Sequence, residues 1–283
     1  MNLTDLSCVR DIMQRHGIAP QKRYGQNFLI NPTVVARIAD TCADREAGVI
    51  EIGPGIGTLT RELSPRFRKV VALEIDTSLI PVLGETLGDL DNVKVINADA
   101  MKTDLAALVK EEFDGMPVYV CANLPYYITS PIVMSLLESG GIFEAVTVMI
   151  QKEVADRFCA VAGSTDYGAI TLAVNYYSEV EKCFNVAPGN FMPPPKVTSS
   201  VIRMNIRKEP PVPVRDSENM FRIIKYAFAC RRKTLVNALC TSSQKCGKAE
   251  VIRTLEKLGY DPNIRGERLA LSDYACISDE LTV

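Results

Sequence analysis

The sequence predicts an α/β protein in which a parallel sheet carries helices on both faces and a small all-helical C-terminal domain follows. Between residues 48 and 150, short apolar runs alternate with helical patterns, an alternation typical of parallel sheets. Residues 208–214 are proline-rich, which excludes a central strand or a helix and predicts a linker. Three helical patterns follow it, so we expect the 283 residues to form one large and one small domain.

The predicted elements are assigned in chain order from their hydrophobic spacing. Strands are expected at residues 48–52, 69–75, 93–98, 117–122 and 145–150, with late strands at 180–186 and 198–206 at the sheet edge. Helices are expected at residues 58–66, 78–87, 131–138, 151–161, 169–177, 217–229, 234–239 and 248–258. The expected domains are an N-terminal arm over 1–21, a main domain over 22–207 and a helical domain over 208–283.

Composition excludes several classes of protein. A net charge of −2 and a pI near 5.7 mean that any nucleic-acid contact must use local positive charge. The nine cysteines are scattered without a Cys-x-x-Cys pair, which indicates buried thiols in a reducing cytoplasm rather than disulfides or zinc. The single histidine, His16, excludes a multi-histidine metal site and is expected to be a solvated surface residue. We expect no metal, no signal peptide and no membrane span.

A glycine-rich turn with two strand-end acids indicates a nucleotide-like cofactor. Gly53, Gly55 and Gly57 lie between a predicted strand and a predicted helix, where a ligand can approach the backbone. Their spacing differs from the Gly-x-Gly-x-x-Gly of dinucleotide binders, which disfavours an NAD oxidoreductase. Glu74, ending the second strand, can accept hydrogen bonds from ribose hydroxyls. Asp99, ending the third strand, can accept one from an adenine amino group. Each residue alone could instead serve a turn or a cap.

The tetrapeptide Asn123-Leu124-Pro125-Tyr126 is suited to holding an exocyclic amine. The side-chain carbonyl of Asn123 and the main-chain carbonyl of Leu124 can both accept hydrogen bonds from one amino group. Pro125 stiffens the turn, and Tyr126 offers a flat face to a purine. For the next residue, Tyr127, core packing is the alternative interpretation.

Five motifs in this order resemble the bacterial small-subunit ribosomal RNA adenine dimethyltransferases, the enzymes whose loss gives kasugamycin resistance. They are residues 25–29, 51–57, 97–100, 123–126 and 190–197. The resemblance covers the chain from about Lys22 to the final helices. It implies a Rossmann-like methyltransferase domain, S-adenosyl-L-methionine as methyl donor, and dimethylation of the 6-amino groups of adjacent adenosines near the 3′ end of small-subunit rRNA. The implied partner is the small ribosomal subunit, bound by a monomer during ribosome biogenesis.

The resemblance also implies roles for individual residues. The cofactor-binding set is Asn27, Leu29, Gly53, Gly55, Glu74, Asp99, Ala100 and Asn123. Phe191 is expected to face Tyr126 across the target base, although its own propensity predicts a core aromatic under a loop. The target base must be unpaired or flipped out to reach such a pocket. Orientation alone can supply roughly 7–11 kcal/mol, so no strong general base is required.

Positive charge gathers late in the chain. Between Arg203 and Lys233 there are nine basic and three acidic residues. We expect RNA contacts from Arg231, Arg232 and Lys233, with Lys22, Arg23 and Lys196 beside the pocket. A solvated helix face is the alternative for the first three. Two other functions stay open: a large-subunit rRNA adenine methyltransferase of the macrolide-resistance type, and a non-catalytic ribosome-assembly or RNA-binding factor of the same fold.

Overall fold

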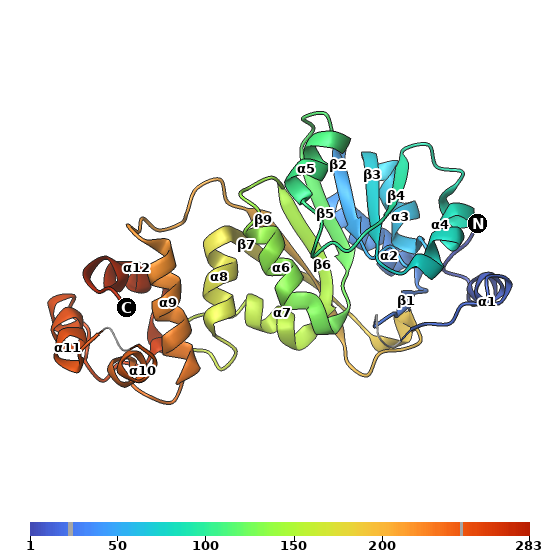
Figure 1. Ribbon diagram of the computed structural model, residues 1–283. Coiled ribbons are helices and arrows are strands. Elements are labelled where there is room, and N and C mark those ends of the chain that lie inside the picture. Colours follow the sequence, from blue (N-terminus) through green and yellow to red (C-terminus); the bar gives the residue numbers. More distant parts are fainter. Residues whose placement is uncertain (22–24, 244–245) are drawn as a thin grey trace. The chain divides into compact units, whose positions relative to one another are not determined.

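The computed structural model describes residues 1–21, 25–243 and 246–283. By its contacts the chain divides into two compact units, one formed by residues 1–155 and 179–206 and the other by residues 156–178 and 207–283. Figure 1 traces the elements along the chain. Each unit is described by itself.

Apart from Ser178, the first residue of β7, all of the strands in the described part of the chain lie in the first unit. They are β1 (Phe28–Leu29), β2 (Asp44–Ile52), β3 (Phe67–Glu74), β4 (Val93–Asn97), β5 (Val118–Asn123), β6 (Ala145–Gln151), β7 (Ser178–Val186), β8 (Phe191–Met192) and β9 (Ser199–Ile206). Its helices are α1 (Leu6–Arg15), α2 (Pro32–Cys42), α3 (Thr58–Leu63), α4 (Ile80–Leu87), α5 (Leu105–Glu112), α6 (Thr129–Leu137) and the start of α7 (Lys152–Phe158). Short 3₁₀ turns are η2 (Ser64–Arg66), η3 (Thr77–Leu79), η4 (Tyr126–Ile128) and η5 (Pro188–Asn190).

Seven strands form one sheet in the order β4-β3-β2-β5-β6-β9-β7. Strands β2 to β6 are parallel, and β9 is antiparallel to β6. The predicted parallel sheet and its late edge strands are therefore confirmed. Because the central strands run the same way, their carboxyl ends meet at one edge, where ligands of open α/β sheets bind.

Helices α2 and α3 share a hydrophobic core with the sheet. Val35 and Ile38 of α2 pack with Val49 of β2 and Val70 of β3, and all four are fully buried. Helix α2 begins at Pro32 after the N-cap Asn31, whose side chain accepts hydrogen bonds from the next turn. This packing fixes the segment before α2, which lines the site described below.

The expected N-terminal arm is wrong, because α1 is part of the first unit's core. Val9 and Ile12 are fully buried and belong to one cluster with Phe28 and Val82, and Figure 1 shows α1 beside α4. His16 is also not merely solvated. Its Nε2 lies 2.6 Å from Oε2 of Glu85 on α4.

The second unit is helical, and it includes a segment that sequence order assigns to the main domain. Its helices are α8 (Ala169–Tyr177), α9 (Ser217–Ala229), α10 (Leu235–Ser242), α11 (Lys248–Lys257) and α12 (Leu271–Glu280), with η6 (Gly266–Arg268) before the last. Helix α8 joins this unit because its buried Leu172 and Tyr176 pack with Met220 and Ile223 of α9. The expected boundaries, 22–207 and 208–283, are corrected accordingly.

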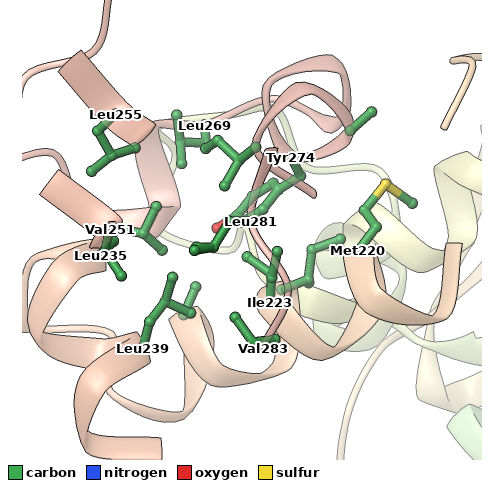
Figure 2. Packing of buried hydrophobic residues seen from close by; sticks show 14 of the residues in the cluster. Met220, Ile223, Leu235, Leu239, Val251, Leu255, Leu269, Tyr274, Leu281 and Val283 are labelled. Atoms are coloured by element: carbon green, nitrogen blue, oxygen red, sulfur yellow. The ribbon is translucent and has the colours of Figure 1, made fainter. Parts of the chain in front are cut away.

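The core of the second unit closes around Tyr274. Its side chain is fully buried, and its hydroxyl donates a hydrogen bond to the Gly266 carbonyl at 3.0 Å. Figure 2 shows this cluster, with Leu239, Val251 and Val283 turned toward the same interior. Helix α12, which carries Tyr274, was not predicted, because its apolar spacing is weak.

In the described part of the chain, no helix has the length and apolar character needed to cross a bilayer. Within the same residues, no group of three or more metal-binding side chains is assembled. The nine cysteines are free thiols.

Candidate active site

The predicted site residues meet at one cavity on the carboxyl edge of the sheet. The cavity is open to solvent and is lined by the carboxyl ends of β2, β3 and β5 and by the loops that follow β2, β4 and β5. Every residue expected to bind cofactor or target base lines it: Asn27, Leu29, Gly53, Gly55, Glu74, Asp99, Ala100, Asn123, Leu124, Tyr126 and Phe191. The structure thus brings together residues that lie more than 160 positions apart in the chain.

The glycine-rich turn depends on backbone angles that favour glycine. Gly55 has φ +61° and Gly57 has φ +88°. A Cβ atom on Gly57 would lie 2.8 Å from Cδ2 of Leu87, and one on Gly55 would lie 3.1 Å from the ring of Phe28. Glycine therefore lets the turn pass close to α4 and to β1, with its backbone along the cavity.

Glu74 supports this turn from the end of β3. Its Oε2 accepts a hydrogen bond from the Gly55 N–H at 3.2 Å, and its Oε1 accepts one from the Asp76 N–H at 2.8 Å. The carboxyl is nearly buried, and burial raises its pKa. Glu74 is thus a turn-stabilising residue as well as a lining residue. The two roles are compatible, since a carboxylate offers about four acceptor positions.

Asp99, which follows β4, can also combine a structural role with a ligand-binding role. Its Oδ1 accepts a hydrogen bond from the Met101 N–H at 3.0 Å, which is the turn role considered as an alternative. Its Oδ2 lies 3.7 Å from Nζ of Lys102, an exposed side chain. At that distance the ion pair is weak, so Oδ2 can accept a hydrogen bond from a ligand.

Glu51 is a lining residue to which the sequence assigned no separate role. It is 1% exposed, and its Oε2 has no hydrogen-bond partner among the described residues. Burial raises the pKa of this carboxyl to about 8. An unpaired buried carboxyl is costly, so a donor or cation entering the cavity would find an acceptor here. The one indication in the sequence is that Glu51 is the first residue of the glycine-rich motif over 51–57.

Asn123 ends β5 with its amide held in one orientation. Its Nδ2 donates a hydrogen bond to the main-chain carbonyl of Asn27 at 3.2 Å. This contact leaves Oδ1 as the amide atom that can accept a hydrogen bond from a ligand. The next residue, Leu124, donates its N–H to the Met149 carbonyl at 3.1 Å, which extends the β5–β6 pairing.

The aromatic residues around the cavity differ in burial. Tyr126 is half-buried, and its hydroxyl lies 2.8 Å from Oγ of Ser199. Phe191 is 3% exposed and packs in the core with Leu29. The two residues are paired in the β1–β8 ladder. Phe191 is thus a core aromatic that also lines the cavity. Tyr127 is 61% exposed, so core packing was wrong for it.

The expected RNA-contacting residues have different surroundings. Arg231 is held by an ion pair with Glu267 at 2.8 Å and by the Ser164 carbonyl. Nζ of Lys233 donates to Oγ1 of Thr241 at 3.3 Å. Both are exposed, as are Arg232 and Lys196, and Lys22 and Arg23 lie outside the described residues.

Charge is divided unequally between the two units. The second unit has fifteen basic and twelve acidic residues, whereas the first has seventeen basic and twenty-two acidic residues. The local excess of positive charge therefore lies in the second unit, which carries the Arg231–Lys233 cluster. Such an excess favours contact with a polyanion.

The fold and the cavity define the class of protein. A mixed seven-stranded sheet with an antiparallel strand near one edge, and a ligand cavity between the glycine-rich turn and two strand-end acids, make the first unit a Rossmann-like methyltransferase domain. The second unit supplies the expected helical part.

The chain belongs to the ribosomal RNA adenine dimethylase family, whose model matches residues 19–268. It is 45% identical to ribosomal RNA small subunit methyltransferase A of Geobacillus thermodenitrificans, over 96% of this chain and 94% of that protein. It is 44% identical to the protein of that name from Streptococcus thermophilus, over 99% and 98% of the two chains. The resemblance drawn from the five motifs is confirmed.

Two solved structures share most of the fold. A dimethyladenosine transferase from Plasmodium falciparum has a TM-score of 0.73 at 26% identity, over 88% of this chain and 95% of that chain. The 23S rRNA methyltransferase ErmE has a TM-score of 0.68 at 29% identity, over 90% and 99%. A dimethyladenosine transferase and a 23S rRNA methyltransferase therefore share most of this fold, so the fold alone does not identify the RNA substrate.

Proposed function

We propose that this protein dimethylates the 6-amino groups of adjacent adenosines in a loop near the 3′ end of small-subunit rRNA, with S-adenosyl-L-methionine as methyl donor. The observation that carries the proposal is the fixed amide of Asn123, whose Nδ2 is taken by the Asn27 carbonyl. Its remaining oxygen suits an amino group in the cavity. The family and the small-subunit names of its relatives support the substrate.

The lining residues fit the methyl donor. Glu74 and Asp99 offer acceptors for the hydroxyl and amino groups of an adenosine, and Oε2 of Glu51 offers a buried acceptor without a partner for an ammonium group. Asn27, which precedes β1, and Leu29, on β1, also line the cavity. When bound, S-adenosyl-L-methionine supplies a methyl group on a cationic sulfur. We propose no metal, since the chemistry needs none.

The chain's own contribution is to hold and orient the target amine. The lone pair of an adenine 6-amino nitrogen is delocalised into the ring. Hydrogen bonds from that amino group to Oδ1 of Asn123 and to the Leu124 carbonyl favour a more pyramidal nitrogen. Tyr126 and Phe191 then position the base plane. Orientation of this kind is worth roughly 7–11 kcal/mol, and the surplus proton can leave to solvent.

The target must be a base outside a helix, because a paired base cannot enter the cavity. We assign docking of the ribosomal subunit to the positive residues of the second unit, and to Lys196, Lys22 and Arg23. The protein would act as a monomer in the cytoplasm, where ribosomes assemble. Sedimentation at micromolar concentration checks the monomer.

Mass spectrometry of rRNA nucleosides tests the function. Unmodified small and large subunits are each incubated with the protein and S-adenosyl-L-methionine, with Asn123→Ala as the inactive control. Dimethyladenosine in small subunits alone is the expected result. Modification of large subunits would favour the alternative that the likeness to ErmE raises. Subunit binding without any methylated adenosine would favour a non-catalytic assembly factor.

A further inference from the structure

Tyr127 is the exception among the aromatic side chains that the structure describes. Among the described Phe and Tyr residues, Tyr127 is the only exposed one, with 61% of its surface accessible. It also lines the candidate active site, directly after Tyr126. An exposed aromatic ring therefore stands at the mouth of the cavity proposed to receive a base.

The ring has a defined support. A Cβ atom on Gly25 would lie 3.6 Å from both Cδ1 and Cε1 of Tyr127, so the ring rests near the Gly25 backbone. Gly25 has φ +59°, a conformation that favours glycine. The Tyr127 hydroxyl has no hydrogen-bond partner within residues 1–21, 25–243 and 246–283. The backbone thus supports part of the ring, and most of the side chain stays open.

The neighbouring Tyr126 shows what a packed tyrosine looks like in the same turn. It is half-buried, and its hydroxyl is bound to Ser199 at 2.8 Å. Both residues belong to η4 and both line the cavity. The turn therefore presents one ring to the interior of the site and one to its entrance.

A single exposed apolar residue is common on protein surfaces, so exposure alone assigns no role. The position at the entrance is what matters. When one base leaves a strand to enter a pocket, its neighbour loses a stacking partner. An aromatic face at the entrance can replace that partner, because every base has a π-face.

We propose that Tyr127 is the stacking platform for the RNA base next to the target adenosine. This inference rests on the proposed function and adds a second base-binding position to it. The platform recognises single-stranded RNA by stacking, so it does not select one base by hydrogen bonds. Its contribution falls on substrate affinity rather than on transfer.

Binding to a short single-stranded oligoadenylate, measured by fluorescence anisotropy, tests the platform without requiring turnover. Tyr127→Ala and Tyr127→Leu should each weaken binding roughly five- to a hundred-fold, the range for loss of one base–aromatic stack. Tyr127→Phe and Tyr127→Trp should stay within about twofold of the wild type, since both keep an aromatic face. Leu6→Ala, which removes a 39% exposed side chain from α1, is the matched control and should change nothing.

Steady-state methylation of unmodified small subunits gives the second readout. Tyr127→Ala should raise KM by a similar factor while kcat, the melting temperature and cofactor affinity stay near wild type. If Tyr127→Ala or Tyr127→Leu binds the oligonucleotide as tightly as the wild type, the platform is overturned. Rescue of binding by Leu but not by Phe would also overturn it. Failure of the wild type to methylate any adenosine would instead overturn the proposed function, because the binding arm does not depend on it.

Discussion

The Asn123 amide donates a hydrogen bond from Nδ2 to the main-chain carbonyl of Asn27 across 3.2 Å. The two residues are 96 positions apart in the chain. One ends β5, and the other precedes β1 in a loop where its own side chain donates to the Gly25 carbonyl at 2.9 Å. This contact joins the proposed target-base residue to the proposed cofactor-binding segment, so the Asn27 backbone orients the oxygen proposed to accept the amine.

Asn123→Ala should lose most methyl transfer, because the amine loses its side-chain acceptor. Removal of one preorganised hydrogen-bonding group at a reacting centre costs about 10²–10³ in kcat. Cofactor affinity should change far less than turnover. Single-turnover methylation and calorimetry measure the two quantities. Asn205→Ala, at an exposed position of β9 outside the cavity, is the control, and near-normal turnover of Asn123→Ala would contradict the assigned role.

Asp99→Asn should weaken binding of S-adenosyl-L-methionine with little effect on the fold. An asparagine can keep the hydrogen bond from the Met101 N–H but replaces the second acceptor by a donor. Loss of a hydrogen bond to a charged group costs about 1.5–3 kcal/mol, or roughly 10- to 100-fold in Kd. Glu74→Ala should show the same loss and also loosen the Gly55 turn that Glu74 holds. Calorimetry that finds unchanged affinity in both variants would remove these acids from the cofactor site.

The sequence predicted most of the strands and the convergence of the site, because strand-end motifs on parallel strands must meet at one edge. Helices α8 and α9 have the expected bounds, since their apolar spacing is regular. Strands β1 and β8 pair over only two residues each. Such short strands leave no alternating pattern in the sequence, so the pairing of Leu29 with Phe191 could not be predicted. Sequence order also could not show that α8 packs on α9.

The sequence also could not predict how deeply individual side chains are buried. Tyr126 and Tyr127 are adjacent and chemically identical, yet one is half-buried and the other is exposed. Glu51 precedes the first glycine of the turn by two positions, and nothing in the sequence shows that its Oε2 is buried without a hydrogen-bond partner. Such differences depend on packing around each side chain, which is a tertiary property.

Glu51→Gln should make the cofactor-free protein more stable at pH 8 than the wild type. The Glu51 pKa is raised by burial from 4.5 to about 8 in the folded chain. Below pH 4.5 both states hold the proton, and between 4.5 and 8 only the folded state does. Ionisation of Glu51 therefore costs the wild type nothing at low pH. As pH rises from 4.5 to 8 it lowers the free energy of unfolding by at most about 4–5 kcal/mol.

Urea denaturation between pH 5 and 8 measures this difference. The advantage of Glu51→Gln should grow across that range, while its affinity for S-adenosyl-L-methionine should fall because the amide cannot ionise when a cationic group binds. Glu46→Gln, an exposed acid at the start of β2, is the control. Parallel pH profiles for wild type and Glu51→Gln would show that the carboxyl is not buried as described.

The combined change Arg231→Ala, Arg232→Ala and Lys233→Ala should weaken binding to the small subunit and flatten its salt dependence. Each lost phosphate contact lowers the slope of log K against log salt by about 0.7–0.9, because fewer counterions are released. Arg231 also forms an ion pair with Glu267 at 2.8 Å. The triple variant therefore removes a local stabilising contact as well as the phosphate contacts.

The double variant Arg232→Ala, Lys233→Ala separates the two effects. It keeps the ion pair of Arg231 and should show about two-thirds of the slope change of the triple variant, with an unchanged melting temperature. Filter binding over a range of salt measures the slope, and Lys110→Ala, an exposed lysine on α5, is the control. Cofactor affinity should stay constant, since all of the described residues that line the cavity belong to the first unit. If the double variant binds with the wild-type slope and affinity, these residues form a solvated face, and RNA docking must be sought at Lys196, Lys22 and Arg23.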